Sequence, residues 1–137
     1  MLTRLLGPQR AGLLIEFMRF GVVGLIGFAI DNATVYGTRH LIGLYWAGAF
    51  AYLTAATINW LVNRLWTYRG RGSGPAHRQW ALFLATNLVG FVLNRGTYAA
   101  LVTFSDTAAN QPVLAIAAGT AAGMLINFHF ARAVVFR

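Results

Sequence analysis

The chain has 137 residues, enough for one domain; 58% of them are hydrophobic and only 10% are charged. A water-soluble domain usually carries about 25% charged residues, so this composition excludes an ordinary soluble globule and favours a membrane protein. The net charge is +8 and there is no cysteine, which excludes disulfides and thiolate metal sites, while arginines at the edges of apolar segments argue against nucleic acid as the partner.

The first half of the chain predicts an arm and two membrane spans. Residues 1–18 predict a cytoplasmic arm, either lying on the lipid headgroups or disordered. Residues 20–38 and 44–62 are each long and apolar enough to cross a hydrocarbon core of about 30 Å. Aromatic residues at both ends of the second span are typical of membrane interfaces. They are Tyr45, Trp46, Trp60 and Trp66.

The second half predicts the same plan. A polar, flexible, basic linker at residues 69–79 separates the halves. Residues 80–104 and 112–130 predict the third and fourth spans, with Pro112 at a favourable first helical position. Small residues recur at helical spacing in three of the four spans, which is typical of close helix packing in lipid. They are Gly21, Gly24 and Gly27; Gly43, Ala47, Ala51 and Ala55; and Ala115, Gly119 and Gly123.

The distribution of arginine predicts the orientation. Nine arginines lie in the arm, the linker region and the C-terminus, and only Arg39 lies in the opposite loops. Because cytoplasmic segments carry the excess of arginine, both termini are predicted to be cytoplasmic. The nine are Arg4, Arg10, Arg19, Arg64, Arg69, Arg71, Arg78, Arg132 and Arg137.

The two halves resemble each other. Residues 27–32 align with 90–95 at a shift of 63, and the segment after Asn59 aligns with that after Asn127 at a shift of 68. Each half holds two spans and therefore starts and ends on the same side. The predicted fold class is an all-α membrane protein with four transmembrane helices arranged as two parallel helical-hairpin repeats. Residues 19–68 form the first repeat and residues 80–137 the second.

Polar residues inside the spans are candidates for function, because they are costly in lipid. Asp31 and Arg95 lie at similar predicted depths, which suggests a pair of opposite charges. The pair could dock the first span on the third, or it could line a path for a hydrophilic group. Three asparagines would add hydrogen bonds to such a path. They are Asn32, Asn87 and Asn94.

The ends of the second and fourth spans carry a second candidate site. Each span ends with an asparagine followed five residues later by an arginine, which offers a planar fork to phosphate. Binding of anionic lipid headgroups is the alternative use of these arginines. The candidate lipid-phosphate residues are Asn59, Asn63, Arg64, Asn127 and Arg132. His40, His77 and His129 have no metal-ligand spacing, and no phosphate-binding loop or hydrolase constellation is present, so the sequence predicts a non-enzyme without cofactor or metal.

From about Phe17 to the C-terminus the chain resembles GtrA-like proteins. The resemblance rests on three segments, of which the middle one is the most specific. They are residues 19–24 (RFGVVG), residues 59–68 (NWLVNRLWTY) and Asn127 with Arg132 and Phe136. Ala131 stands where the first repeat has Asn63, which puts phosphate binding at the second end in doubt.

The resemblance implies translocation of a polyprenyl-phosphate-linked sugar across the cytoplasmic (inner) membrane for cell-envelope polysaccharide synthesis. A membrane-associated glycosyltransferase would load the sugar, and a homodimer would enlarge the path that four helices enclose. Two alternatives stay open. The chain could anchor that glycosyltransferase without transport, or it could be a small multidrug exporter, a class that also has an acidic residue in its first span.

Overall fold

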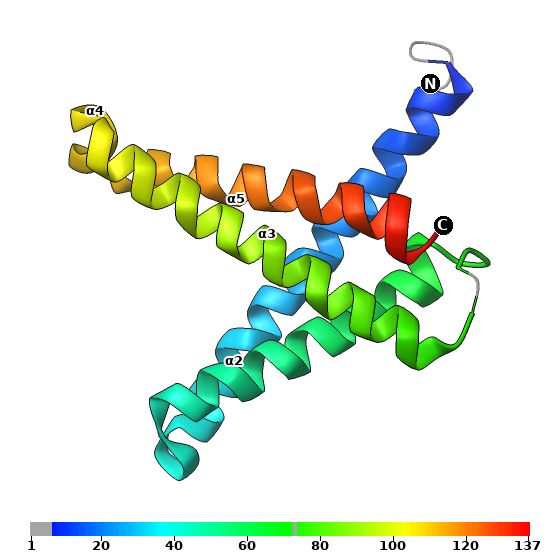
Figure 1. The fold of residues 1–137 in the computed structure, drawn as a ribbon, viewed down its shortest axis with the longest axis horizontal. Coiled ribbons are helices and arrows are strands. Elements are labelled where there is room, and N and C mark those ends of the chain that lie inside the picture. The colour runs from blue at the N-terminus through cyan, green and yellow to red at the C-terminus, as the bar shows by residue number, and fades with distance from the viewer. Residues whose placement is uncertain (1–6, 73) are drawn as a thin grey trace. The chain divides into compact units, whose positions relative to one another are not determined.

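The computed structural model describes residues 7–72 and 74–137. The start of the predicted arm, including Arg4, and Ser73 of the linker lie outside the described residues. The described chain is almost entirely helical (Figure 1), which confirms the all-α class. The chain divides into two compact units: residues up to Gly74 with Phe136, and residues 75–135 with Arg137.

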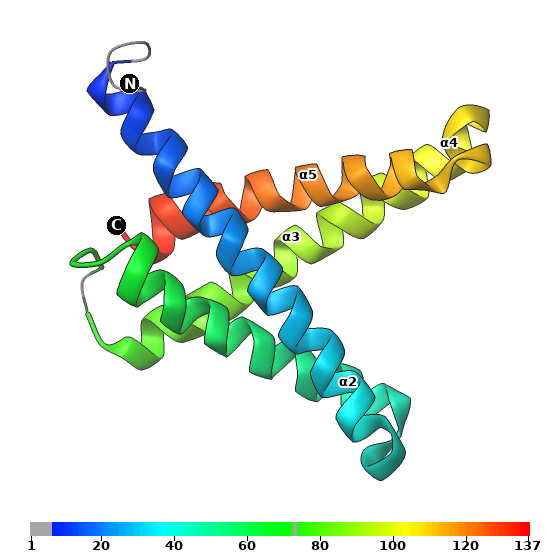
Figure 2. The ribbon, with the colours of Figure 1, turned by 180° about the vertical axis from the view of Figure 1, so that it is seen from behind.

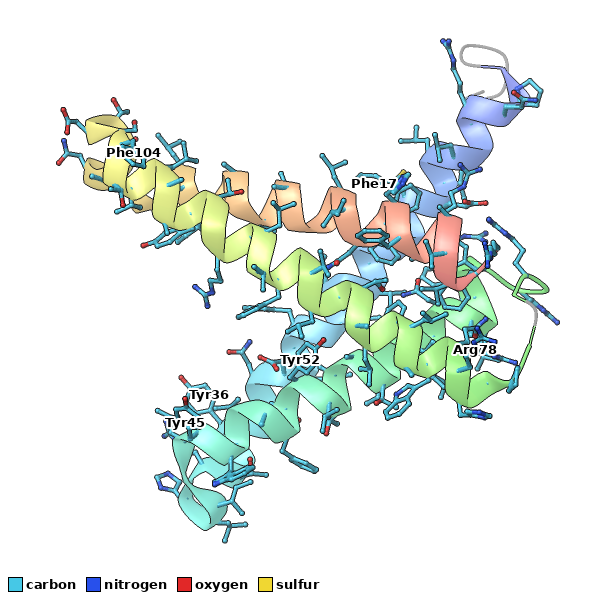
Figure 3. All side chains as sticks on the ribbon, viewed as in Figure 1. Phe17, Tyr36, Tyr45, Tyr52, Arg78 and Phe104 are labelled. Atoms are coloured by element: carbon cyan, nitrogen blue, oxygen red, sulfur yellow. The ribbon has the colours of Figure 1, made fainter. Side chains whose placement is uncertain are left out.

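The first unit is one long helix folded back on itself. Helix α2 spans Pro8–Val62 and is followed by the π-helical turn η1 at Asn63–Thr67. Gly43 has φ 81° and ψ 160°, a left-handed conformation that only glycine adopts without strain, and there the chain reverses direction. The two arms, residues 8–42 and 44–62, run side by side in both views (Figures 1 and 2). Tyr36 and Tyr45 lie near the bend (Figure 3) and are exposed, as expected of interfacial aromatics.

The first arm is longer than the predicted span. Helix α2 begins at Pro8, in the favourable first position, so residues 8–18 of the predicted arm are helical and continuous with the span. At 1.5 Å per residue, residues 8–42 reach about 52 Å, well beyond a hydrocarbon core of about 30 Å. Residues 39–42, predicted to lie in a loop, also belong to this helix.

The second unit is a pair of helices joined by a short one. Helix α3 spans Ala76–Phe104, α4 spans Asp106–Asn110 and α5 spans Pro112–Phe130, followed by the π-helical turn η2 at Ala131–Val135. Helices α3 and α5 lie side by side along their length (Figures 1 and 2). The Ser105 side chain accepts a hydrogen bond from the Ala108 backbone N–H at 3.3 Å and so caps α4. Because α3 begins at Ala76, the predicted linker is shorter than residues 69–79.

Small residues form the helix contacts within the second unit. A side chain at Gly119 would meet the Asn94 backbone oxygen at 2.6 Å, and one at Gly123 would meet the Gly90 backbone oxygen at 2.9 Å. The stripe on α5 therefore lets it approach the backbone of α3, as predicted. In α2, Ala47, Ala51 and Ala55 are buried.

The outer surface is unusually apolar. Leu25, Phe28 and Leu41 are 71%, 70% and 83% exposed, among many other large hydrophobic side chains. Two helical stretches, Pro8–Thr67 and Val113–Val135, are long and apolar enough to cross a membrane. Large apolar surfaces of this kind indicate contact with lipid. The polar residues inside α3, Asn87, Asn94 and Arg95, lower its hydropathy below that of the other long helices.

Candidate functional site: the asparagine–arginine helix ends

Both predicted asparagine–arginine ends are π-helical turns. Turn η1 covers Asn63–Thr67 and turn η2 covers Ala131–Val135, so the second turn starts 68 residues after the first (63 to 131). Arg64 and Arg132 hold the second position of their turns. Single π-helical turns are rare and occur frequently at functional sites. The sequence alignment placed the two segments in register, but the change of helical period was not predicted.

Asn59 and Asn127 serve helix packing. The Asn59 amide occupies the space that a side chain at Gly27 would need, with its Cγ only 2.6 Å from the position of that Cβ. The Asn127 amide lies in the same way against Gly90, with its Nδ2 at 2.7 Å. Each asparagine therefore packs against a glycine of the neighbouring arm or helix within its own unit. The Oδ1 atoms of both are buried and have no hydrogen-bond partner among the described residues.

The start of the first arm and the end of the second arm of α2 meet in a basic cluster. The Arg64 guanidinium lies over the Trp60 ring at 5.7 Å, and that of Arg19 lies over the Trp66 ring at 5.5 Å. Cation–π contacts of this kind hold a guanidinium in place over an aromatic ring. An ion pair of 2.9 Å between Arg71 Nη1 and Glu16 Oε1 ties the loop after η1 to the first arm. The cluster thus combines several arginines with a single carboxylate.

The two turns differ in the polarity of their buried side. In η1, Asn63 and Thr67 are 1% and 7% exposed, and neither Asn63 Oδ1 nor Thr67 Oγ1 has a hydrogen-bond partner among residues 7–72 and 74–137. In η2 the same positions hold Ala131 and Val135, which are also buried.

A side chain of α3 holds the end of the second turn. The Val135 carbonyl accepts a hydrogen bond from Gln79 Nε2 at 3.4 Å. Thr67 and Gln79 were not predicted to be functional, although the alignment at a shift of 68 pairs Thr67 with Val135 and so carried the signal.

The predicted intramembrane polar residues do not form one cluster within either unit. Asn32 Nδ2 donates to the Phe28 carbonyl at 2.8 Å, and Asn87 Nδ2 donates to the Phe83 carbonyl at 2.9 Å, so both satisfy their own helix. Asn94 faces α5 at Gly119 and Gly123.

The two charged residues of this set belong to different units. Asp31 lies partly buried in the first arm of α2. Arg95 is exposed on α3, with its guanidinium over the Phe91 ring at 5.6 Å. Among the described residues, no three His, Asp or Glu side chains gather in a way that could hold a metal ion.

The long apolar helices and their exposed apolar side chains indicate a membrane protein, and each of the two units contains an arginine-bearing π-helical turn. Residues 19–136 match the profile of the GtrA/DPMS transmembrane domain. The chain therefore belongs to the GtrA/DPMS transmembrane domain family, which confirms the resemblance found in the sequence. Comparison with curated proteins returned no match.

Proposed function

We propose that the chain crosses the inner membrane four times, as two parallel helical pairs with both termini in the cytoplasm. The bend at Gly43 divides α2 into two arms, and α3 and α5 are 29 and 19 residues long, so each of these four helical segments is long enough to span the core. The Gly27–Asn59 and Gly90–Asn127 contacts recur at corresponding positions, which supports the repeat. The excess of arginine at these helix ends supports a cytoplasmic position for the turns η1 and η2.

Single cysteines test this topology, because the natural sequence has none. We expect His77→Cys, at the exposed start of α3, to react with a membrane-impermeant maleimide only in inside-out vesicles. His40→Cys near the bend and Thr107→Cys in α4 should react only in intact spheroplasts, since both are exposed, His40 just before the bend at Gly43 and Thr107 in the short helix that joins α3 to α5. Reaction of His77→Cys and Thr107→Cys from the same side would contradict the four-span topology.

We propose that this protein translocates a polyprenyl-phosphate-linked sugar across that membrane and performs no bond chemistry of its own. The observation that carries the proposal is Arg64, held over Trp60 on a π-helical turn and next to the buried Asn63, within a basic cluster. A guanidinium matches the geometry of a phosphate group, and the arginines favour the cytoplasmic face where a loaded lipid would arrive. Membership of the GtrA/DPMS transmembrane domain family supports the same substrate class.

The remaining features fit the parts of such a substrate. The exposed apolar faces of the helices suit a polyprenyl tail, and anionic lipids suit the other cytoplasmic arginines. The sugar would pass polar side chains within the membrane, including Asp31, Asn94 and Arg95. Arg95 is exposed, and a guanidinium facing lipid is costly, which favours a neighbour such as a second copy of the chain. A membrane-associated glycosyltransferase would supply the loaded lipid.

Two substitutions separate translocation from anchoring. We expect Asp31→Asn and Arg95→Gln to reduce the output of the modified cell-surface glycan at matched protein levels, because each removes a polar group from the sugar path. Asp106→Asn in α4 and Arg39→Gln near the bend are the controls, since each removes one charge outside the proposed path. If both path variants keep wild-type output, the protein acts as an anchor for the glycosyltransferase and the translocation proposal fails.

A further inference from the structure

Within the part of the chain that the structure describes, the first π-helical turn buries two polar side chains, each with an oxygen atom that has no hydrogen-bond partner. Asn63 is 1% exposed and Thr67 is 7% exposed. Asn63 Oδ1 and Thr67 Oγ1 are both buried without a hydrogen-bond partner. The two residues are the first and last of η1, four positions apart, with Arg64 next to Asn63 in the same turn.

Unsatisfied buried polar groups destabilise a protein, so such groups in a native structure call for an explanation. The geometry of the turn does not supply one. Turn η2 has the same length and the same π-helical form, yet Ala131 and Val135 occupy the corresponding positions and are 1% and 4% exposed. An apolar pair is therefore sufficient to build this turn, so forming the turn does not require the polar pair of η1.

The chemistry of the pair suits an anion. The threonine hydroxyl is a hydrogen-bond donor, and the asparagine amide presents its two N–H donors when it rotates about its last torsion. Together with the Arg64 guanidinium, these groups would supply neutral donors beside a positive charge, a combination that phosphate oxygens accept well. A cation is disfavoured, because the turn belongs to a cluster rich in arginine.

We infer that η1 is a phosphate-binding turn in which Thr67 and Asn63 donate to the phosphate that Arg64 attracts, and that η2 has no such site. This inference rests on the proposed function and makes Thr67 a ligand-binding residue in addition to the predicted ones. In η2, the Val135 carbonyl is bonded to Gln79, and the buried positions offer no donor beside Arg132. The two turns therefore share a shape but differ in ligand binding.

The test uses substitutions that the chain itself supplies. Thr67→Val and Asn63→Ala copy the residues of η2, so the turn is able to accept them. For Thr67→Val, which keeps the shape of the side chain, we expect a higher thermal midpoint of the purified protein in detergent, since an unsatisfied polar group is removed; Asn63→Ala also leaves a cavity, which offsets this gain. Each should also weaken binding of a polyprenyl monophosphate, measured by microscale thermophoresis, about tenfold or more. Thr54→Val is the matched control, because its hydroxyl donates to the Phe50 carbonyl of its own helix at 2.9 Å; it should leave lipid affinity unchanged.

The outcomes separate the inference from the function on which it rests. If inorganic phosphate competes with the polyprenyl monophosphate, the turn recognises the phosphate group alone. If the lipid binds without such competition, the turn recognises the phosphate as part of the lipid. Both outcomes support the inference. Wild-type affinity in both Thr67→Val and Asn63→Ala would overturn it while leaving the translocation proposal intact. A wild-type protein that binds neither probe would overturn both.

Discussion

Gly119→Val should prevent stable packing of α5 on α3, whereas Gly96→Val should be tolerated. A Cβ at Gly119 would lie 2.6 Å from the backbone oxygen of Asn94, and the backbone of a helix cannot turn aside as a side chain can. Overpacking of this kind typically costs about 1–3 kcal/mol of stability, and the two γ-methyl groups of valine add to this cost. Gly96 lies on the same helix as Asn94 but has nothing within 4 Å of its Cβ position. Unfolding in a denaturing detergent titration would measure the loss.

A matched double substitution shows whether the asparagine–glycine contacts act as described. We expect Gly90→Ala to be destabilising because the Asn127 amide fills the space of its Cβ, and Asn127→Ala in the same chain should restore much of the lost stability. The corresponding pair in the first unit is Gly27 with Asn59, and Gly24, which faces open space, is the control there. Additive losses in the double variant would contradict the contact between Gly90 and Asn127.

Arg64→Ala should reduce transport of the lipid-linked sugar about tenfold to a hundredfold. This reduction corresponds to the loss of one hydrogen bond to a charged group, which contributes about 1.5–3 kcal/mol. Arg64→Lys should recover only part of this loss, since lysine keeps the charge but not the planar fork. Arg69→Ala is the matched control, because Arg69 is exposed, lies just beyond η1 and is expected to act as a topology charge. Equal transport by Arg64→Ala and Arg69→Ala would show that Arg64 has no special role.

Arg64→Ala also removes the contact with the Trp60 ring, which is worth about 0.5–1 kcal/mol at an exposed site. Transport is therefore compared at equal amounts of folded protein, judged by a monodisperse profile in detergent. A loss of folded protein that fully accounts for the loss of transport would remove the support for a phosphate contact.

The helices could be predicted from the sequence, because long apolar stretches bounded by Pro8, Gly43 and Pro112 leave few alternatives. The start of α2 was harder, since residues 8–18 mix polar and apolar side chains and only their continuity with the span makes them helical. The bend at Gly43 depends on one positive φ angle, and neighbouring glycines such as Gly48 look alike in sequence.

The candidate site could be located but not resolved in detail. The repeated asparagine–arginine pattern identified both helix ends, yet Asn59 and Asn127 pack against glycines. The shift of 63 aligns the two glycines and the shift of 68 aligns the two asparagines, so neither alignment by itself shows that each asparagine contacts a glycine. The π-helical turns leave no signature in composition, because they arise from one extra residue in a turn of an otherwise regular helix. Thr67 was missed because the alignment at a shift of 68 pairs it with Val135, and this difference in polarity gains meaning only once both positions are known to be buried in matching turns.

Transbilayer movement of a labelled polyprenyl-phosphate sugar in proteoliposomes is the most direct measurement of translocation. The label is placed on the inner leaflet, and its arrival at the outer leaflet is followed by a membrane-impermeant reagent that modifies the sugar. Translocation predicts that the wild-type protein moves the lipid well above the rate in protein-free liposomes. A rate equal to that of protein-free liposomes, from protein that is folded and still associates with the glycosyltransferase, would contradict it.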